Sequence, residues 1–347
     1  MTEIDRYRPD DRRQVEALYR RVFGPDAAEA NRLRWEWQYG RNPHVPADGP
    51  LIWIAREGTT IVGQYAAMPV RLSVQGREID AAWGMDVMVA PERQRQGLGD
   101  QLFRTWDRAV GASLGLGLSD SSFRLFQKMS WPVVGPVPCM VKPLSRRALR
   151  RPSWPLPVNR FVSYVTLPWV RVVARARPLQ GEVTVIRQFD DRFTRLWQRL
   201  APRFAFVVRR DAAYLNWKYI QAPHVRYTIA ALIRDGEAAG YVVYRHKQEP
   251  RGRVTLLVDF LVDPDDAGGL NTLLRWVDRE ARAADTDKIR AYALHAGFRK
   301  LIKKNGYYSV KSTMEFVAKI NAFEPQADFY KATENWHVTL GDSDQDR

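Results

Sequence analysis

An internal repeat sets the architecture of this chain. Trp37-Gln38-Tyr39 precedes Pro43-His44, and 180 residues later Trp217-Lys218-Tyr219 precedes Pro223-His224. Three more landmarks recur in the same order at offsets of 177, 173 and 176 residues: the strand-leading glycines Gly63 and Gly240, the strands from Asp86 and Asp259, and the turns Ser130-Trp131 and Gly306-Tyr307. Order kept at nearly constant spacing indicates a duplicated structural unit.

The length of the chain agrees with a duplication. With 347 residues, it exceeds what one hydrophobic core usually organises. We therefore expect a first domain at 1–140, a linker at 141–180, a second domain at 181–325 and a C-terminal tail at 326–347.

Hydrophobic periodicity predicts an α/β fold for each copy. In the first copy, Leu102, Phe103, Trp106 and Val110 recur at the spacing of one helical face, and 79–89 is apolar and β-branched. We expect a mixed, mostly antiparallel sheet flanked by helices. Its elements are helices near 11–22, 97–110 and 123–129 and strands near 51–56, 61–74, 78–89 and 114–118.

The turn between the strand at 78–89 and the helix at 97–110 carries the most informative motif. Gly97 and Gly99 let backbone N–H groups converge without a Cβ in the way, and Arg93 and Arg95 add positive charge. A helix N-terminus contributes about half a positive charge more. The turn therefore predicts a pyrophosphate site.

This run resembles the acyl-CoA signature of the GNAT acetyltransferase superfamily, Gln/Arg-x-x-Gly-x-Gly/Ala, which Gln94, Gly97 and Gly99 fill. Residues 126–131 look like the family's last helix and its following turn. The resemblance implies two tandem GNAT folds and acetyl-CoA or another acyl-CoA as co-substrate, without a metal. It implies that backbone groups of Val87, Met88 and Val89 bind pantetheine and that Gln94, Arg95, Gln96, Gly97, Leu98 and Gly99 bind the pyrophosphate.

The second copy differs at the same turn. Asp265 and Asp266 stand where the first copy has arginines, and carboxylates repel a pyrophosphate. We therefore expect a degenerate second copy and one acyl-CoA per chain.

Acyl transfer to an amine needs a group that accepts the amine's proton. Asp86 on the central strand is the candidate base, although Asp259 holds the same place in the copy expected not to bind acyl-CoA, which indicates a structural role instead. The tyrosine that many family members use as an acid is replaced by Phe126. Ser122 could hold water or the CoA sulfur, or cap a helix.

Cysteine and terminal composition bear on the compartment. The single cysteine, Cys139, excludes an internal disulfide, and no His, Cys and carboxylate cluster has metal-ligand spacing. The N-terminus lacks a signal-peptide pattern, and no apolar run could span a membrane. These features favour the cytoplasm, free or peripherally attached to the inner face of the membrane.

The linker is basic and apolar. No acidic residue lies between Asp120 and Glu182, while the formal net charge of the chain is +15. Residues 142–177 could bind an anionic membrane, with Trp131, Trp154 and Trp169 at headgroup depth, or pack between the domains. Prolines at 152, 155, 157, 168 and 178 are expected to prevent one long amphipathic helix.

The leading function is therefore an acyl-CoA-dependent N-acyltransferase. The acceptor would be an amine of a small or sugar-linked molecule, because residues 210–219 look similar to GNAT proteins associated with bacterial surface-polysaccharide synthesis. Two alternatives are a FemA-like aminoacyl transferase and a non-enzymatic module that binds nucleic acid or membrane. The intact phosphate turn argues against the aminoacyl transferase.

Overall fold

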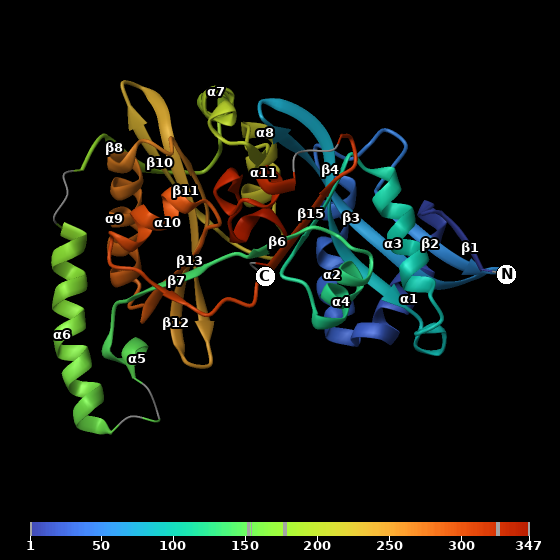
Figure 1. Ribbon diagram of the computed structural model, residues 1–347, viewed down its shortest axis with the longest axis horizontal. Coiled ribbons are helices and arrows are strands. Elements are labelled where there is room, and N and C mark those ends of the chain that lie inside the picture. Colours follow the sequence, from blue (N-terminus) through green and yellow to red (C-terminus); the bar gives the residue numbers. More distant parts are fainter. Residues whose placement is uncertain (1, 151–152, 154, 176–178, 324–326, 346–347) are drawn as a thin grey trace. The chain divides into compact units, whose positions relative to one another are not determined.

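The computed structural model describes residues 2–150, 153, 155–175, 179–323 and 327–345 (Figure 1). It contains two compact units, each assembled from separate parts of the chain. Unit 1 comprises Met1–Gly135, Ala213–Val225 and Glu315–Lys331. Unit 2 comprises Pro136–Ala212, Arg226–Met314 and Ala332–Arg347.

Unit 1 is built on a mixed sheet in the order β1-β2-β3-β4-β5-β15-β6. Most neighbours are antiparallel, whereas β4 and β5 run parallel. The strands are β1 (Thr2–Arg6), β2 (Ile52–Glu57), β3 (Thr60–Val74), β4 (Arg77–Val89), β5 (Ala112–Leu116), β15 (Glu315–Ile320) and β6 (Val133–Pro136).

Helices flank this sheet because their apolar faces and its strands are buried together. Tyr65 of β3 stacks on Trp106 of α3, whereas Asp86 of β4 meets Tyr19 of α1 and Asn31 of α2. The helices of unit 1 are α1 (Arg12–Phe23), α2 (Pro25–Trp35), α3 (Leu98–Ala109), α4 (Asp120–Lys128) and α11 (Ala327–Lys331), with π-helices at Glu36–Gly40 and Asn216–Ile220.

A strand from late in the chain completes the sheet of unit 1. β15 pairs antiparallel with β5, with Ala318 opposite Leu114. Just beyond β15, the side-chain amide of Asn321 donates to the carbonyl of Asp107 at 2.6 Å, and the Lys319 ammonium lies 2.5 Å from the Asp107 carboxylate. Residues about 200 positions apart are thus needed to close this core.

Unit 2 contains a second mixed sheet, in the order β14-β7-β13-β12-β11-β10-β8. Here the strand from early in the chain is β7, which pairs antiparallel with β13 so that Met140 lies opposite Ala291. The strands are β14 (Tyr308–Val310), β7 (Cys139–Pro143), β13 (Lys288–Tyr292), β12 (Gly252–Val262), β11 (Glu237–Glu249), β10 (Thr228–Arg234) and β8 (Glu182–Ile186).

The helices of unit 2 include a long one in the segment expected to be a linker. They are α5 (Arg146–Leu149), α6 (Leu156–Arg175), α7 (Asp191–Leu200), α9 (Ala267–Ala283) and α10 (Ala296–Lys303). The short strands β9 (Phe206–Val208) and β16 (Trp336–His337) pair with each other, and residues 336–344 are buried. Along the chain, the division between the two units falls within the short helix α8 (Ala212–Leu215), after Ala212.

The structure confirms the predicted fold class, with two mixed sheets flanked by helices. The expectation that prolines prevent a long helix in the linker is wrong. Pro157 lies in the first turn of α6, where its missing N–H costs no hydrogen bond, and the 20-residue helix accommodates Pro168 internally. Trp131 is not available to a membrane, because it is buried against Phe103 and Trp106. Trp154 lies outside the described residues.

Two further observations concern the described residues alone. None of their helices combines the length and apolarity that crossing a bilayer requires. Their His, Cys, Asp and Glu side chains form no group of three or more that could hold a metal ion.

Candidate functional site

Strands β4 and β5 diverge at the centre of unit 1. Their parallel pairing extends only from Ala81–Ala112 to Trp83–Leu114. A β-bulge then interrupts the pairing of β4 with β3 between Tyr65 and Ala67. Beyond it, β4 continues to Val89 with β3 on one side and no described strand on the other. An unpaired strand edge offers N–H and C=O groups to an extended, amide-containing ligand.

The chain turns directly from this open edge into helix α3. Arg95 has a φ of 63° and Gly97 one of 82°, so the turn uses the left-handed region twice. Gly97 is the N-cap of α3 and offers no side-chain acceptor. The first hydrogen bond into the helix runs from Gln101 N to Gly97 O at 3.1 Å, and no described group accepts from the amides of 95–99. Backbone amides at the N-terminus of a helix are groups that can bind an anion.

The side chains of the turn stabilise its shape. The Gln94 side-chain amide donates to Val89 O at 3.1 Å, and the Gln96 amide donates to Glu92 O at 3.0 Å. A Cβ on Gly97 would meet no atom within 4 Å, so the surface in front of this residue is open. Hydrogen bonds within the turn therefore help to hold its conformation.

Of the two arginines at the turn, one is engaged elsewhere. The Arg93 guanidinium pairs with Glu57 of β2 at 2.6 Å. Arg95 is exposed and has no carboxylate partner among the described residues. Asp100 in the first turn of α3 is paired with Arg104 at 3.2 Å, which offsets its negative charge. Arg95 is thus the cation available to an anion here.

Asp86 lies on the bulged part of β4 and is buried. Its Oδ2 accepts hydrogen bonds from Tyr39 Oη at 2.8 Å and Asn31 Nδ2 at 3.1 Å, and its Oδ1 accepts one from Tyr19 Oη at 3.2 Å. Burial, followed by the Asp86 carboxylate, raises the pKa of Tyr39 well above its ordinary value, so this phenol stays a neutral donor. Asp86 thereby joins α1, α2 and the π-helix Glu36–Gly40 to β4.

The structure places Ser122 in the first turn of α4 rather than before the helix. Ser119 is the N-cap, and its Oγ accepts a hydrogen bond from Ser122 N at 3.2 Å. The two hydroxyls are 3.0 Å apart. Among the described residues, the hydrogen bonds to the Asp86 carboxylate come from Tyr19, Asn31 and Tyr39 and not from Ser122. Phe126 packs against the rings of Phe103 and Trp131.

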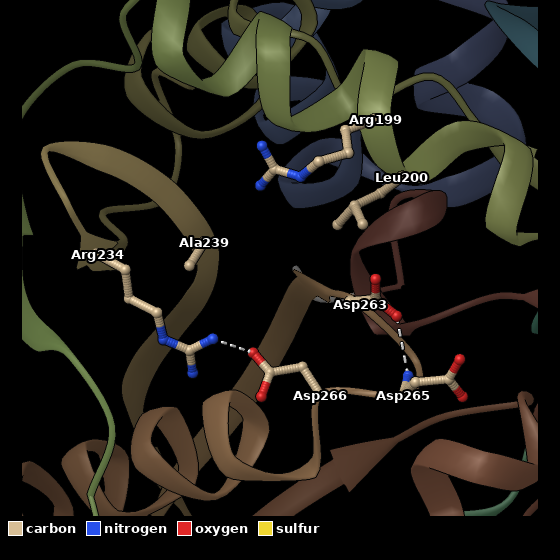
Figure 2. A pocket seen from close by; sticks show the side chains of 7 residues that line it. All are labelled: Arg199, Leu200, Arg234, Ala239, Asp263, Asp265 and Asp266. Carbon is tan, nitrogen blue, oxygen red and sulfur yellow. Dashed lines mark hydrogen bonds and ion pairs between the residues drawn. The ribbon is translucent and has the colours of Figure 1, made fainter.

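The corresponding turn of unit 2 lines a hollow of about 350 Å³ (Figure 2). Asp266 is the N-cap of α9: its Oδ1 accepts a hydrogen bond from Gly269 N at 2.8 Å. Its Oδ2 pairs with Arg234 Nη1 at 2.6 Å, as Figure 2 shows. Arg203 pairs with Asp265, and the Gln180 side chain lies against Gly268. Protein side chains therefore occupy the anion position of this helix.

The sequence-predicted residues of β4 and of the phosphate turn lie on one continuous segment, from Val87 through Gly99, in which Met88 and Leu98 are buried. Sequence reasoning missed the partners of Asp86. Tyr39 belongs to the repeated Trp-Gln-Tyr motif and so carried a signal, whereas Tyr19 and Asn31 carried none. The two histidines of the repeat contact aromatic rings: His44 stacks on Tyr214, and His224 contacts Trp37.

Comparison with known proteins agrees with this geometry. Residues 3–116 match the family model described as "Acetyltransferase (GNAT) domain". None of the curated proteins matches the chain. The matched range contains β4 and the β4–α3 turn.

Solved structures are similar to this chain over most of its length. A GCN5-related N-acetyltransferase from Anabaena variabilis superimposes with a TM-score of 0.63 at 12% identity, covering 92% of this chain and 73% of its own. One from Kribbella flavida gives 0.61 at 14%, covering 93% and 71%. N-myristoyltransferase of Saccharomyces cerevisiae with bound myristoyl-CoA gives 0.58 at 12%, covering 92% and 79%. At these identities the similarity shows that the chain has the GNAT fold.

Proposed function

We propose that this chain is an acyl-CoA-dependent N-acyltransferase whose donor binds at the β4–α3 turn of unit 1. The observation that carries the proposal is the uncapped N-terminus of α3, placed directly after the unpaired edge of β4. The pyrophosphate would accept from the amides of 95–99 and pair with Arg95. The pantetheine amides would pair with the edge of Val87–Val89, which brings the thioester to the divergence of β4 and β5.

The reaction would join a neutral amine to the acyl carbon. The C–N bond forms, the C–S bond breaks, the thiolate leaves, and the proton of the amine passes to a base or to water. Because a thiolate leaves readily, the packing of Phe126 where family members often have tyrosine does not prevent the reaction. We place Asp86 as a positioning residue, because three donors already engage its carboxylate and fix α1 and α2 beside β4.

We propose further that the two halves are tandem copies and that the second takes no acyl-CoA. In unit 2, Asp266 already caps α9 and pairs with Arg234, so a pyrophosphate would have to displace a bound carboxylate. We propose acetyl-CoA as the donor. The acceptor would be a small or sugar-linked amine in surface-polysaccharide metabolism.

Calorimetry with acetyl-CoA tests the site and its stoichiometry. We expect one molecule bound per chain, and Gly97→Glu should weaken binding at least about fivefold, since a carboxylate near the anion costs roughly 1–4 kcal/mol. The matched control is Gly58→Glu: Gly58 has a φ of 58°, lies in the turn between β2 and β3, and likewise has open space at its Cβ. Two molecules per chain, or equal effects of both variants, would refute the proposed site.

Turnover tests the reaction itself. Thiol release from acetyl-CoA, and then from longer acyl-CoAs, should depend on an added amine and should be lost in Gly97→Glu but kept in Gly58→Glu. Tight acyl-CoA binding without thiol release across a broad amine panel would support a binding module instead.

A further inference from the structure

Helix α6 (Leu156–Arg175) presents large apolar side chains to solvent. It lies at the edge of unit 2 in Figure 1. Phe161 is 70% exposed, Tyr164 75% and Trp169 59%. Together with two valines they form one stripe at helical spacing, which we call the α6 face: Val158, Phe161, Tyr164, Val165 and Trp169. A folded protein rarely leaves so much contiguous apolar surface in water without a partner.

The surroundings of the α6 face are positively charged. The short helix α5 (Arg146–Leu149) packs against α6, so its arginines lie close to this helix. The exposed arginines of this region have no carboxylate partner among the described residues, and we call them the flanking arginines: Arg146, Arg147, Arg150 and Arg160. No acidic residue occurs anywhere between Asp120 and Glu182.

We propose that the α6 face and the flanking arginines bind the surface of an anionic lipid bilayer. The apolar side chains would enter the region between headgroups and acyl chains, where tryptophan and tyrosine are favoured. The arginines would pair with lipid phosphates, each strengthening binding by about fivefold near an anionic surface. The helix would lie in the plane of the interface rather than cross it, in agreement with its composition.

Charge distinguishes this partner from a second copy of the chain. Two α6 faces in contact would bring their flanking arginines together without any intervening acid, and like charges at an interface oppose association. An anionic bilayer instead supplies the negative charge that the region lacks. The inference is independent of the proposed acyl transfer, because none of these residues belongs to the β4–α3 turn.

Vesicle flotation with the full chain tests the proposal. The protein should float with vesicles of two parts phosphatidylcholine to one part phosphatidylglycerol and remain unbound with phosphatidylcholine alone. Raised salt should weaken binding through screening. Replacing Arg146 and Arg147 with Gln should reduce affinity by at least about tenfold, given about fivefold per residue. The control replaces two exposed arginines outside the region, Arg77 and Arg108.

The apolar contribution needs its own variants. Phe161→Gln with Trp169→Gln should also reduce vesicle binding at least about tenfold, as expected for two large side chains that leave an apolar medium. Leu33→Gln is the control, because Leu33 is an exposed apolar residue of α2 in unit 1. A Phe161→Cys variant labelled with an environment-sensitive fluorophore should show a blue shift with anionic vesicles; the native Cys139 is buried and should not react.

The results separate the alternatives. Equal losses in the arginine variants and their control would mean adsorption by overall charge, and no shift of the label would mean that α6 does not insert; either result overturns the proposal. Absence of flotation at low salt overturns it too. Sedimentation that shows a dimer of the wild type and a monomer of the Phe161 and Trp169 variant, without vesicle binding, would assign the α6 face to self-association.

Discussion

Trp37 and Trp217 stack on each other with ring centroids 4.9 Å apart, and each indole N–H donates to the other's backbone carbonyl at 2.7 Å. Each residue lies in a five-residue π-helix, Glu36–Gly40 and Asn216–Ile220. Both segments belong to unit 1, although they are 180 residues apart in sequence. The pair thus forms a symmetric contact between the two most similar segments of the chain.

This reciprocity predicts strong coupling between the two tryptophans. Trp37→Phe or Trp217→Phe removes one N–H donor and leaves a buried carbonyl unpaired, so each should lower the free energy of unfolding by about 1–3 kcal/mol. The double variant should lose less than the sum, by about 0.5–2 kcal/mol. Urea unfolding measures both. Trp53→Phe is the control, because the Trp53 ring contacts Arg6 and neither tryptophan of the pair; combined with Trp37→Phe its effect should be additive.

Each sheet contains a strand from the other end of the chain: β15 lies in unit 1 and β7 in unit 2. This exchange of strands predicts that the first 140 residues do not fold by themselves. In unit 1, β15 lies between β5 and β6, and Phe316, Val317 and Ala318 are fully buried. A fragment of residues 1–140 would expose the edge of β5 and this part of the core. We expect it to lack a cooperative thermal transition by circular dichroism. Co-expression with residues 141–347 should restore the transition, whereas a cooperative transition in the fragment alone would contradict the exchange.

The local parts of the site could be predicted from the sequence, whereas the exchange could not. The turn at 89–99 is encoded within eleven neighbouring residues by its glycines and the apolar strand before it. By contrast, β7 and β15 occupy equivalent places in the repeat, and both are short, mostly buried strands without a local feature that distinguishes one sheet from the other. Which sheet each strand joins depends on contacts such as Asn321 with Asp107, more than 200 positions apart. No local sequence pattern indicates these long-range contacts.

Buried His337 predicts a decline of stability at acid pH. Burial, and then the charge of Arg210, lower the pKa of His337 to about 3, from 6.5 when it is unfolded. The unfolded chain therefore binds a proton below pH 6.5 that the folded chain does not. The contribution of His337 to the free energy of unfolding is fully present above pH 6.5 and is lost as the pH falls toward 3. The free energy of unfolding should fall by about 2 kcal/mol between pH 7 and pH 5.

His337→Phe should remove this pH dependence, because the ring stacks with Phe204 and a phenyl ring can replace it. The variant loses a hydrogen bond to Phe260 O, so its stability at pH 7 should fall, but the difference from wild type should shrink as the pH falls. Urea unfolding at three pH values measures the difference. A constant difference between the proteins would show that His337 is not the group that titrates.

Asp86→Asn separates the two roles considered for this carboxylate. The variant keeps the shape but turns an acceptor oxygen into an NH₂ group, which would face Tyr19 Oη, or Asn31 Nδ2 and Tyr39 Oη. If Asp86 positions α1 and α2, the free energy of unfolding should fall by about 1–3 kcal/mol. In that case turnover falls with a pH profile of unchanged shape, and Tyr39→Phe reproduces part of both losses. We expect this result.

If Asp86 instead accepts the proton of the amine, stability should hold, turnover should fall roughly 100-fold, and the acid limb of kcat/KM should disappear. The pH profile decides between the two roles, because a structural defect lowers activity at every pH whereas loss of a base changes its dependence on protons.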